Sequence, residues 1–121
     1  MDRRSLGRIG EDHAAEFLRA HGWRILGRNV RQGRREVDII ASRGAVLAFI
    51  EVKCRRSRAH GDPLEAITLW KQRRIVQVAR EWLRETKLPP GTRIRSDAIS
   101  VLHPRGGPVE ILHEPDAWRL E

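Results

Sequence analysis

Four charged residues lie on two short stretches of the sequence that otherwise resemble β-strands. One residue separates Glu36 from Asp38 in "EVDII", and one residue separates Glu51 from Lys53 in "FIEVK". Because alternate side chains of a strand point to the same face, each pair shares a face. Carboxylate oxygens suit Mg²⁺, for which Mn²⁺ can substitute. An ion held by Asp38 and Glu51 would activate a water against a phosphodiester, and Lys53 would orient that water or stabilise the transition state.

The segment between these stretches predicts how they meet. "SRGA" at 42–45 is typical of a tight turn, which makes the two strands a hairpin. With Arg43-Gly44 as a two-residue loop, Glu36 falls opposite Glu51. A different loop shifts this register and leaves the faces of the side chains unchanged. The three carboxylates and the lysine then converge, and such like charges repel unless a proton or a cation intervenes.

The hydrophobic spacing predicts the elements that position these residues. We expect a helix over 5–22, with Ser5 as its N-cap and Gly22 as its stop. Strands are expected over 23–31, 35–41, 46–53, 93–102 and 108–112, and a short helical turn near the end that packs Trp118. These elements predict an α/β fold with a mixed central sheet flanked by helices, in a single domain spanning 1–121.

A second helix is expected over 60–85 and ends before "LPPG". Asp62 would be its N-cap, Pro63 its first residue, and Glu65 the partner in a capping box. Lys71 lies midway between Ile67 and Ile75 on the apolar stripe of this helix, so it should point inward.

Arginine dominates the basic residues. Of the 24 Lys and Arg residues, only Lys53, Lys71 and Lys87 are lysine. A lysine in such a chain indicates a position where a compact ammonium is needed rather than a planar guanidinium. This favours a role in the site for Lys53 and for Lys71, whereas Lys87, near a polar helix end, is typical of chance.

The charge and composition narrow the class of partner. A net charge of +8 favours nucleic acid over a membrane as the partner, although a basic surface that only keeps the protein soluble is the alternative. We expect contacts to phosphates from Lys71, Arg55, Arg56 and Arg74. No apolar run is long enough to span a bilayer. The one cysteine, Cys54, excludes an internal disulfide and a cysteine-based zinc site, so we expect a cytoplasmic setting and no membrane partner.

Each of these residues also has a simpler interpretation. Glu36 could form a solvated ion pair with Arg34 or Arg35. Glu51 and Lys53 could form the exposed face of an edge strand. Lys71 could extend past the core to solvent, and an acidic residue such as Glu11 could favour the dipole of a first helical turn.

The ordered motifs "GEDHAAEFL", "EVDII", "FIEVKCR", "GDPLEAI", Lys71 and "RSDAISV" resemble the small bacterial YraN-type family. That family is similar to archaeal Holliday-junction resolvases, within the restriction-endonuclease-like superfamily and its PD-(D/E)xK motif. The resemblance implies an αβββαβ core, Asp38 and Glu51 as metal ligands, and Lys53 as the catalytic lysine. Glu11 and Glu36 match further acidic positions, Glu11 as a metal ligand and Glu36 as a catalytic residue. Val37 replaces the proline of the motif, and Arg35 stands where we expect a glycine.

Three hypotheses follow. The first is a Mg²⁺-dependent endonuclease that acts on structured or branched DNA, for which a homodimer would suit a cut in two strands. The second is a nucleic-acid-binding module of the same fold that cuts nothing. The third is an adaptor whose basic face docks a protein or RNA. The complete set of Asp38, Glu51 and Lys53 favours the first hypothesis over the second.

Overall fold

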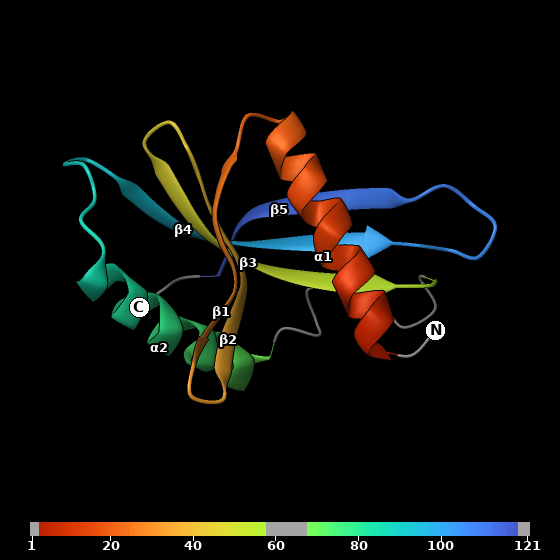
Figure 1. Cartoon of the computed structure of the whole chain (residues 1–121), viewed down its shortest axis with the longest axis horizontal. Helices are drawn as coiled ribbons and strands as arrows, with labels where there is room; N and C mark the ends of the chain where they lie inside the picture. The colour runs from red at the N-terminus through yellow and green to blue at the C-terminus, as the bar shows by residue number, and fades with distance from the viewer. Residues whose placement is uncertain (1–2, 58–67, 119–121) are drawn as a thin grey trace.

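The computed structural model of the chain describes residues 3–57 and 68–118. Helices and strands follow the predicted order of one helix, three strands, a second helix and two strands (Figure 1). Their bounds are α1 Arg3–Ala20, β1 Arg24–Gln32, β2 Arg35–Arg43, β3 Val46–Arg55, α2 Leu69–Glu85, β4 Arg93–Leu102 and β5 Glu110–Trp118.

The five strands form one mixed sheet in the order β1-β2-β3-β4-β5. Neighbouring strands are antiparallel except β3 and β4, which are parallel. Parallel neighbours need a long crossover connection, and the segment containing α2 provides it. The expected mixed sheet with flanking helices is therefore confirmed.

The two helices cover opposite faces of the sheet, and each face has its own core. On one face, Ala14, Ala15 and Leu18 of α1 pack against Ile39, Ile50 and other strand residues. On the opposite face, α2 packs against other residues of the sheet: the α2-side cluster joins Ile75, Val78 and Ala79 to Val37, Ile40, Leu47, Phe49, Ala98 and Trp118. Burial on both faces explains why the β3 sequence is almost continuously apolar.

Both predicted helix starts are wrong. α1 begins at Arg3, so Ser5 lies inside the helix, in keeping with the high helix propensity of arginine. α2 begins at Leu69, and the side chain of its N-cap Thr68 accepts a hydrogen bond from the backbone N–H of Lys71 (3.2 Å). The predicted cap residues Asp62, Pro63 and Glu65 lie outside the described residues, as does Ile67. Neither described helix contains an apolar stretch long enough to cross a membrane.

The helix ends are as predicted. α1 ends before Gly22, where the backbone N–H of Trp23 bonds to the carbonyl of Leu18 (2.9 Å), the pattern of a Schellman C-cap. α2 ends at Glu85, before "LPPG".

The hairpin between β2 and β3 has a different register from the predicted one. Arg43 pairs with Val46, so the loop is Gly44-Ala45 rather than Arg43-Gly44. Gly44 has a φ of 59°, and this left-handed conformation suits the first position of a two-residue hairpin loop. The shift moves the opposing residues by two positions, which leaves the face of every side chain unchanged.

The C-terminal segment is a strand rather than the expected helical turn. β5 continues to Trp118, which packs as predicted and is 8% exposed. The register of β4 and β5 shifts between Ser96 and Ala98, and the Asp97 carboxylate there accepts the backbone N–H of Asp116 (2.9 Å). That bond holds the far end of β5 on the sheet. Its Pro115 is tolerated because β5 is an edge strand.

Gly10 sets the distance between α1 and β3. A methyl group at this position would overlap the Cβ of Cys54 and lie 2.9 Å from its Sγ. The Cβ is fixed to the backbone of β3 and cannot rotate away, so Gly10→Ala should push the helix off the sheet. Overpacking of this kind costs about 1–3 kcal/mol, and the higher helix propensity of alanine offsets up to about 1 kcal/mol of it.

We therefore expect Gly10→Ala to lower the free energy of unfolding in urea. Gly7→Ala is the matched control, because it lies on the same helix with nothing within 4 Å of the added methyl group. This control should raise stability by up to about 1 kcal/mol. Equal stability of the two variants would contradict the close packing of α1 on β3.

Asp97 predicts how stability depends on pH. Its carboxylate is fully buried and bonds to Arg95 Nε and Nη2 (both 2.9 Å), and it contacts His113 Nε2 (2.7 Å). Burial alone would raise the pKa of Asp97, but the bonds from His113, Arg95 and the Asp116 N–H together lower it. The stability it contributes is therefore complete above the pKa of an unfolded aspartate, about 3.9, and is lost as pH falls through the lower folded value.

Asp97→Asn should cost about 3 kcal/mol at neutral pH, the lower end of the range for breaking a buried ion pair, because Arg95 is 14% exposed. The difference from wild type should be constant from pH 7 to 5 and shrink below about pH 4. Urea unfolding at several pH values measures it. A difference that grows in acid would contradict the assignment.

Candidate functional site

The candidate site lies where β2 and β3 separate. Their pairing runs from Arg43–Val46 to Ile39–Ile50 and stops there. Beyond this point β2 pairs with β1 and β3 pairs with β4. Figure 1 shows the β1–β2 hairpin turning away from β3, which continues beside β4. We call this divergence the fork; Asp38 and Glu51 are the first residues past the last pair.

One carboxylate oxygen stabilises the fork. Asp38 Oδ2 accepts a hydrogen bond from the backbone N–H of Val52 (2.8 Å). A side chain of β2 therefore contacts the backbone of β3 beyond the end of the paired region. This bond holds Asp38 beside the segment of β3 that carries Glu51. Asp38 and Glu51 line the same cleft, so the prediction that they share a face is confirmed.

Three carboxylates form an acidic cluster at the fork. Glu11, Glu36 and Asp38 each offer an oxygen atom, and these oxygens lie within 4.8 Å of one another. Glu11 comes from α1, next to Gly10, so the close packing of that helix on β3 brings Glu11 to the fork. Its Oε1 is buried, has no hydrogen-bond partner among the described residues, and lies 3.8 Å from the nearest Arg28 nitrogen.

Two lysines contact the buried Glu51 from different elements. Glu51 is only 4% exposed, and its Oε1 lies 2.6 Å from Nζ of Lys71 and 3.6 Å from Nζ of Lys53. Lys71 extends from the first turn of α2, and Lys53 is two residues further along β3. The prediction that Lys71 points toward the site rather than to solvent is confirmed.

The protonation of these groups reflects burial and mutual charge. Burial, with the charge and hydrogen bond of Glu51, raises the pKa of Asp38 well above its ordinary value. Burial also raises the pKa of Glu11, with a smaller contribution from the charge of Glu36. Burial lowers the pKa of Lys53, and its contact with Lys71 adds to that effect. Burial would lower the pKa of Lys71 too, but the Glu51 charge outweighs it and raises that pKa.

A cleft opens from this site between β2 and the first turns of α2, and we call it the carboxylate cleft. Its volume is about 400 Å³. The described residues that line it are Arg34, Glu36, Asp38, Glu51, Trp70, Lys71, Arg74 and Ile75. Arg74 donates a hydrogen bond to the Arg34 carbonyl (3.0 Å), and its guanidinium lies 4.4 Å from the centre of the Trp70 ring.

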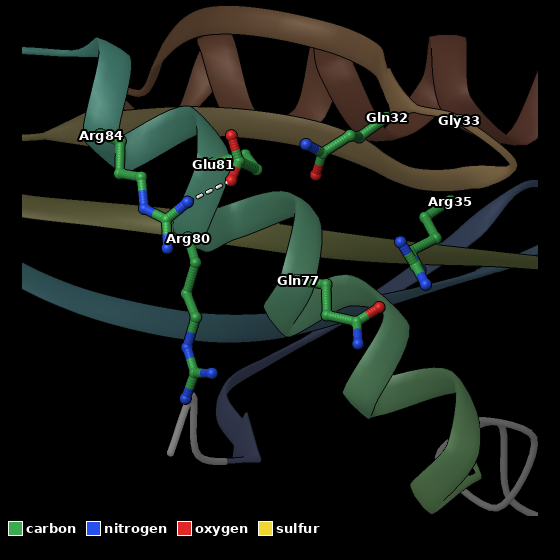
Figure 2. Close-up of a pocket in the computed structure, with 7 residues that line it drawn as sticks. All are labelled: Gln32, Gly33, Arg35, Gln77, Arg80, Glu81 and Arg84. Atoms are coloured by element: carbon green, nitrogen blue, oxygen red, sulfur yellow. Dashed lines mark hydrogen bonds and ion pairs between the residues drawn. The ribbon is translucent and has the colours of Figure 1, made fainter.

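A second hollow, the basic groove, lies further along α2. Its volume is about 380 Å³, and it runs between that helix and the loop that joins β1 to β2. Figure 2 shows Gln77, Arg80, Glu81 and Arg84 projecting from successive turns of α2, and Gln32 and Arg35 projecting from the hairpin. Glu81 forms an ion pair with Arg84 within this groove.

Comparison with known proteins identifies the family. A model described as "Uncharacterised protein family UPF0102" matches residues 10–101, which is well over half of the chain. The chain belongs to the UPF0102 family. It is 44% identical to a UPF0102 protein of Rhodococcus opacus, over 94% of this chain and 96% of that relative. It is also 44% identical to one from Syntrophotalea carbinolica (98% and 95%) and 41% identical to one from Geotalea daltonii (98% and 93%).

In this UPF0102 chain the fork gathers most of the predicted site residues. They are Glu11, Glu36, Asp38, Glu51, Lys53, Lys71 and Arg74. The predicted phosphate contacts Arg55 and Arg56 do not line the carboxylate cleft. Arg56 instead donates a hydrogen bond to the carbonyl of His103 (3.4 Å), the residue that follows the end of β4.

The structure also decides between the simpler interpretations. Glu36 does form an ion pair, but with Arg31 (3.4 Å), which lies directly across from it on β1. Glu51 does not lie on the exposed face of an edge strand, because its side chain is 4% exposed. Glu11 lies beyond the first turn of α1, so a role at the helix dipole is excluded.

Trp70 and Arg34 are residues of the cleft that the sequence analysis did not single out. Trp70 is 66% exposed, next to the equally exposed Leu69. Its sequence position offered one signal, because it precedes Lys71 directly in a helix whose apolar stripe does not include it. Arg34, Arg35, Arg80 and Arg84 had no distinguishing signal among so many arginines.

The residues of the acidic cluster fit a divalent metal ion. An oxygen-only donor set suits Mg²⁺ or Mn²⁺, and the buried Glu11 Oε1 lacks a hydrogen-bond partner among the residues that the structure describes. Burial raises the pKa values of Glu11 and Asp38, and the charges of neighbouring carboxylates add to the effect, so a bound cation would stabilise the ionised forms. Glu51, which was predicted as a ligand, is not part of this group, whereas Glu36 is; the Glu51 carboxylate instead pairs with Lys71.

Asp38→Asn should stabilise the metal-free protein by about 0.5–2 kcal/mol, the usual range for relieving an unfavourable charge at a site. The asparagine oxygen can still accept the Val52 N–H, and its NH₂ group can donate to Glu51. Millimolar Mg²⁺ should raise the melting temperature of the wild type but not of this variant.

Glu16→Gln is the control, because it removes a negative charge from the exposed face of α1. It should leave the Mg²⁺ response intact. A Mg²⁺ response that survives Asp38→Asn would place the ion elsewhere.

Proposed function

We propose that this protein is a Mg²⁺-dependent endonuclease that hydrolyses phosphodiesters in structured or branched DNA. The observation that carries the proposal is the fork, where four carboxylates and two lysines from four elements converge beside an open cleft. Buried acidic and basic groups with shifted pKa values in a cleft are typical of catalytic sites.

The fold supports the same proposal. The order of helix, three strands, helix and strand matches the αβββαβ core of the restriction-endonuclease-like superfamily, with β5 as an addition. The similarity to archaeal Holliday-junction resolvases rests on the motif "EVDII" followed by "FIEVK". Val37 and Arg35 depart from the expected motif, but the hairpin still presents Asp38 and Glu51 at the fork.

Asp38, Glu11 and Glu36 would hold the ion, and Glu51 would reach it from beside Asp38. The ion would supply a water of lowered pKa and positive charge against the phosphate. This preorganised arrangement makes electrostatic stabilisation stronger than it would be in water.

The two lysines would have different tasks. Lys71 neutralises Glu51 at 2.6 Å in the free protein and would exchange part of that contact for a phosphate oxygen when substrate enters. Lys53 is less tightly held, at 3.6 Å, and its pKa is lowered by burial and by Lys71. A lysine poised in this way can hold or transfer a proton of the attacking water.

The basic groove would bind the DNA backbone beyond the cut. It follows the carboxylate cleft along α2, and from Lys71 to Arg80 the helix rises about 14 Å. Three arginines and one glutamate are among its described lining residues, so its charge favours phosphates. Arg74, in the carboxylate cleft, lies between the two.

A cleavage assay with the full chain tests the proposal. Wild-type protein should cut a branched DNA in Mg²⁺, and Asp38→Asn should abolish cutting and bind as well or better, because it removes a negative charge beside the phosphate. Lys53→Arg should also cut at least 100-fold more slowly with near-normal binding, because a planar guanidinium cannot replace the ammonium at the water.

Arg84→Gln separates binding from cutting. It should weaken binding and reduce the dependence of affinity on salt by about one phosphate contact, yet cut at the wild-type rate once DNA saturates the enzyme. Cutting that survives Asp38→Asn would contradict the proposed site. Binding by the wild type without cutting of any DNA would instead favour the silent nucleic-acid-binding module.

A further inference from the structure

Trp70 is largely exposed and belongs to neither apolar core among the residues that the structure describes. The side chains of Trp23 and Trp118 are 4% and 8% exposed, and Trp82 packs edge-to-face with Phe49 in the core. Trp70 is 66% exposed and lines the carboxylate cleft. Tryptophan is buried in most proteins, so an indole left open beside a charged cleft indicates a binding role.

Its neighbours hold the indole in place. The guanidinium of Arg74 lies 4.4 Å from the ring centre, and Arg74 is itself anchored by its hydrogen bond to the Arg34 carbonyl. One face of the indole is therefore covered by a fixed cation, and its exposure lies at the opposite face and the edges. Such an arrangement presents a flat apolar surface whose orientation is already set before a ligand arrives.

We infer that Trp70 is a stacking platform for an unpaired nucleobase next to the phosphate that enters the carboxylate cleft. An aromatic ring stacks on any base, and Arg34 and Arg74 on the same cleft would contact the adjoining phosphates. The bases of an intact duplex are stacked on one another and offer no face to the indole. The substrate would therefore carry an unpaired nucleotide at the cut, as single strands, flaps and junctions do.

A docked protein is a poorer explanation of this exposure. Stable protein interfaces bury more than about 1,000 Å² in total, and the described apolar exposure here is confined to Trp70 and the adjacent Leu69. Leu69 does not line the cleft, whereas Trp70 shares it with Asp38, Glu51 and Lys71. Because the indole lies within a strongly charged cleft, its surroundings suit a base attached to a phosphate better than an apolar protein surface.

The inference rests on the proposed function, so its test uses binding rather than cutting. The full chain is titrated in EDTA with three labelled DNAs of one sequence: a single strand, a blunt duplex, and a duplex with a single-stranded flap. Trp70→Ala should weaken binding of the single strand and the flap by about 5- to 150-fold, the range for losing one stacked base. Binding of the blunt duplex should change less than about twofold, and Trp70→Phe should recover most of the loss.

Leu69→Ala is the matched control, since it removes an equally exposed apolar side chain from the neighbouring position outside the cleft. It should leave all three affinities unchanged. The single strand should also quench the indole fluorescence of the wild type but not that of Trp70→Phe, which retains the buried tryptophans. This spectroscopic change requires direct contact with the base.

If Trp70→Ala weakened binding of the duplex and of the single strand equally, the inference would be overturned. It would also be overturned if Leu69→Ala weakened binding as much as Trp70→Ala. Self-association that Trp70→Ala abolishes without any effect on DNA would assign the indole to a contact between copies, and would also overturn it. Failure of the wild type to cut DNA in Mg²⁺ would overturn the proposed nuclease, while selective binding of unpaired DNA through Trp70 would still support the stacking platform.

Discussion

The hydrogen bond from the Val52 N–H to Asp38 is the contact on which the site depends. Past Ile39–Ile50 the two strands take different neighbours, and a buried backbone N–H without a partner would be costly. The Asp38 carboxylate satisfies that N–H (2.8 Å), so the sheet can open without leaving the donor unpaired. The same bond fixes Asp38 beside Glu51. One hydrogen bond therefore both satisfies the backbone where the strand pairing ends and positions Asp38.

The fork needs both helices, because they supply charged residues to it from opposite faces of the sheet. α1 packs closely enough at Gly10 to bring Glu11 beside Asp38, and α2 supplies Lys71 from the other face. Glu51 at 4% exposure would be strongly destabilising if it had no cation beside it. The apolar cores beneath the two helices hold these elements in place, and their burial offsets the cost of the gathered charges.

The sequence predicted much of this arrangement because period-2 alternation survives an error in register. The hairpin loop was misplaced by one residue, yet Glu36, Asp38, Glu51 and Lys53 kept their faces. The start of α2 could not be predicted, because Asp62 and Pro63 form a stronger local cap signal than Thr68. The strand at 114–118 was missed because it depends on a tertiary contact, the bond from the Asp116 N–H to Asp97. Trp70 was missed because exposure is a property of the folded chain.

The choice of lysine over arginine at the fork follows from the geometry around Glu51. Two ammonium groups approach one oxygen atom of a nearly buried carboxylate, at 2.6 and 3.6 Å. A guanidinium typically binds both oxygens of a carboxylate in one plane, whereas an ammonium binds a single oxygen as a compact point charge. In a chain that has arginine at most basic positions, the two lysines occur where two point charges must share one acceptor. That arrangement also leaves Glu51 and its lysines able to exchange partners as a phosphate enters, which a bidentate pair would resist.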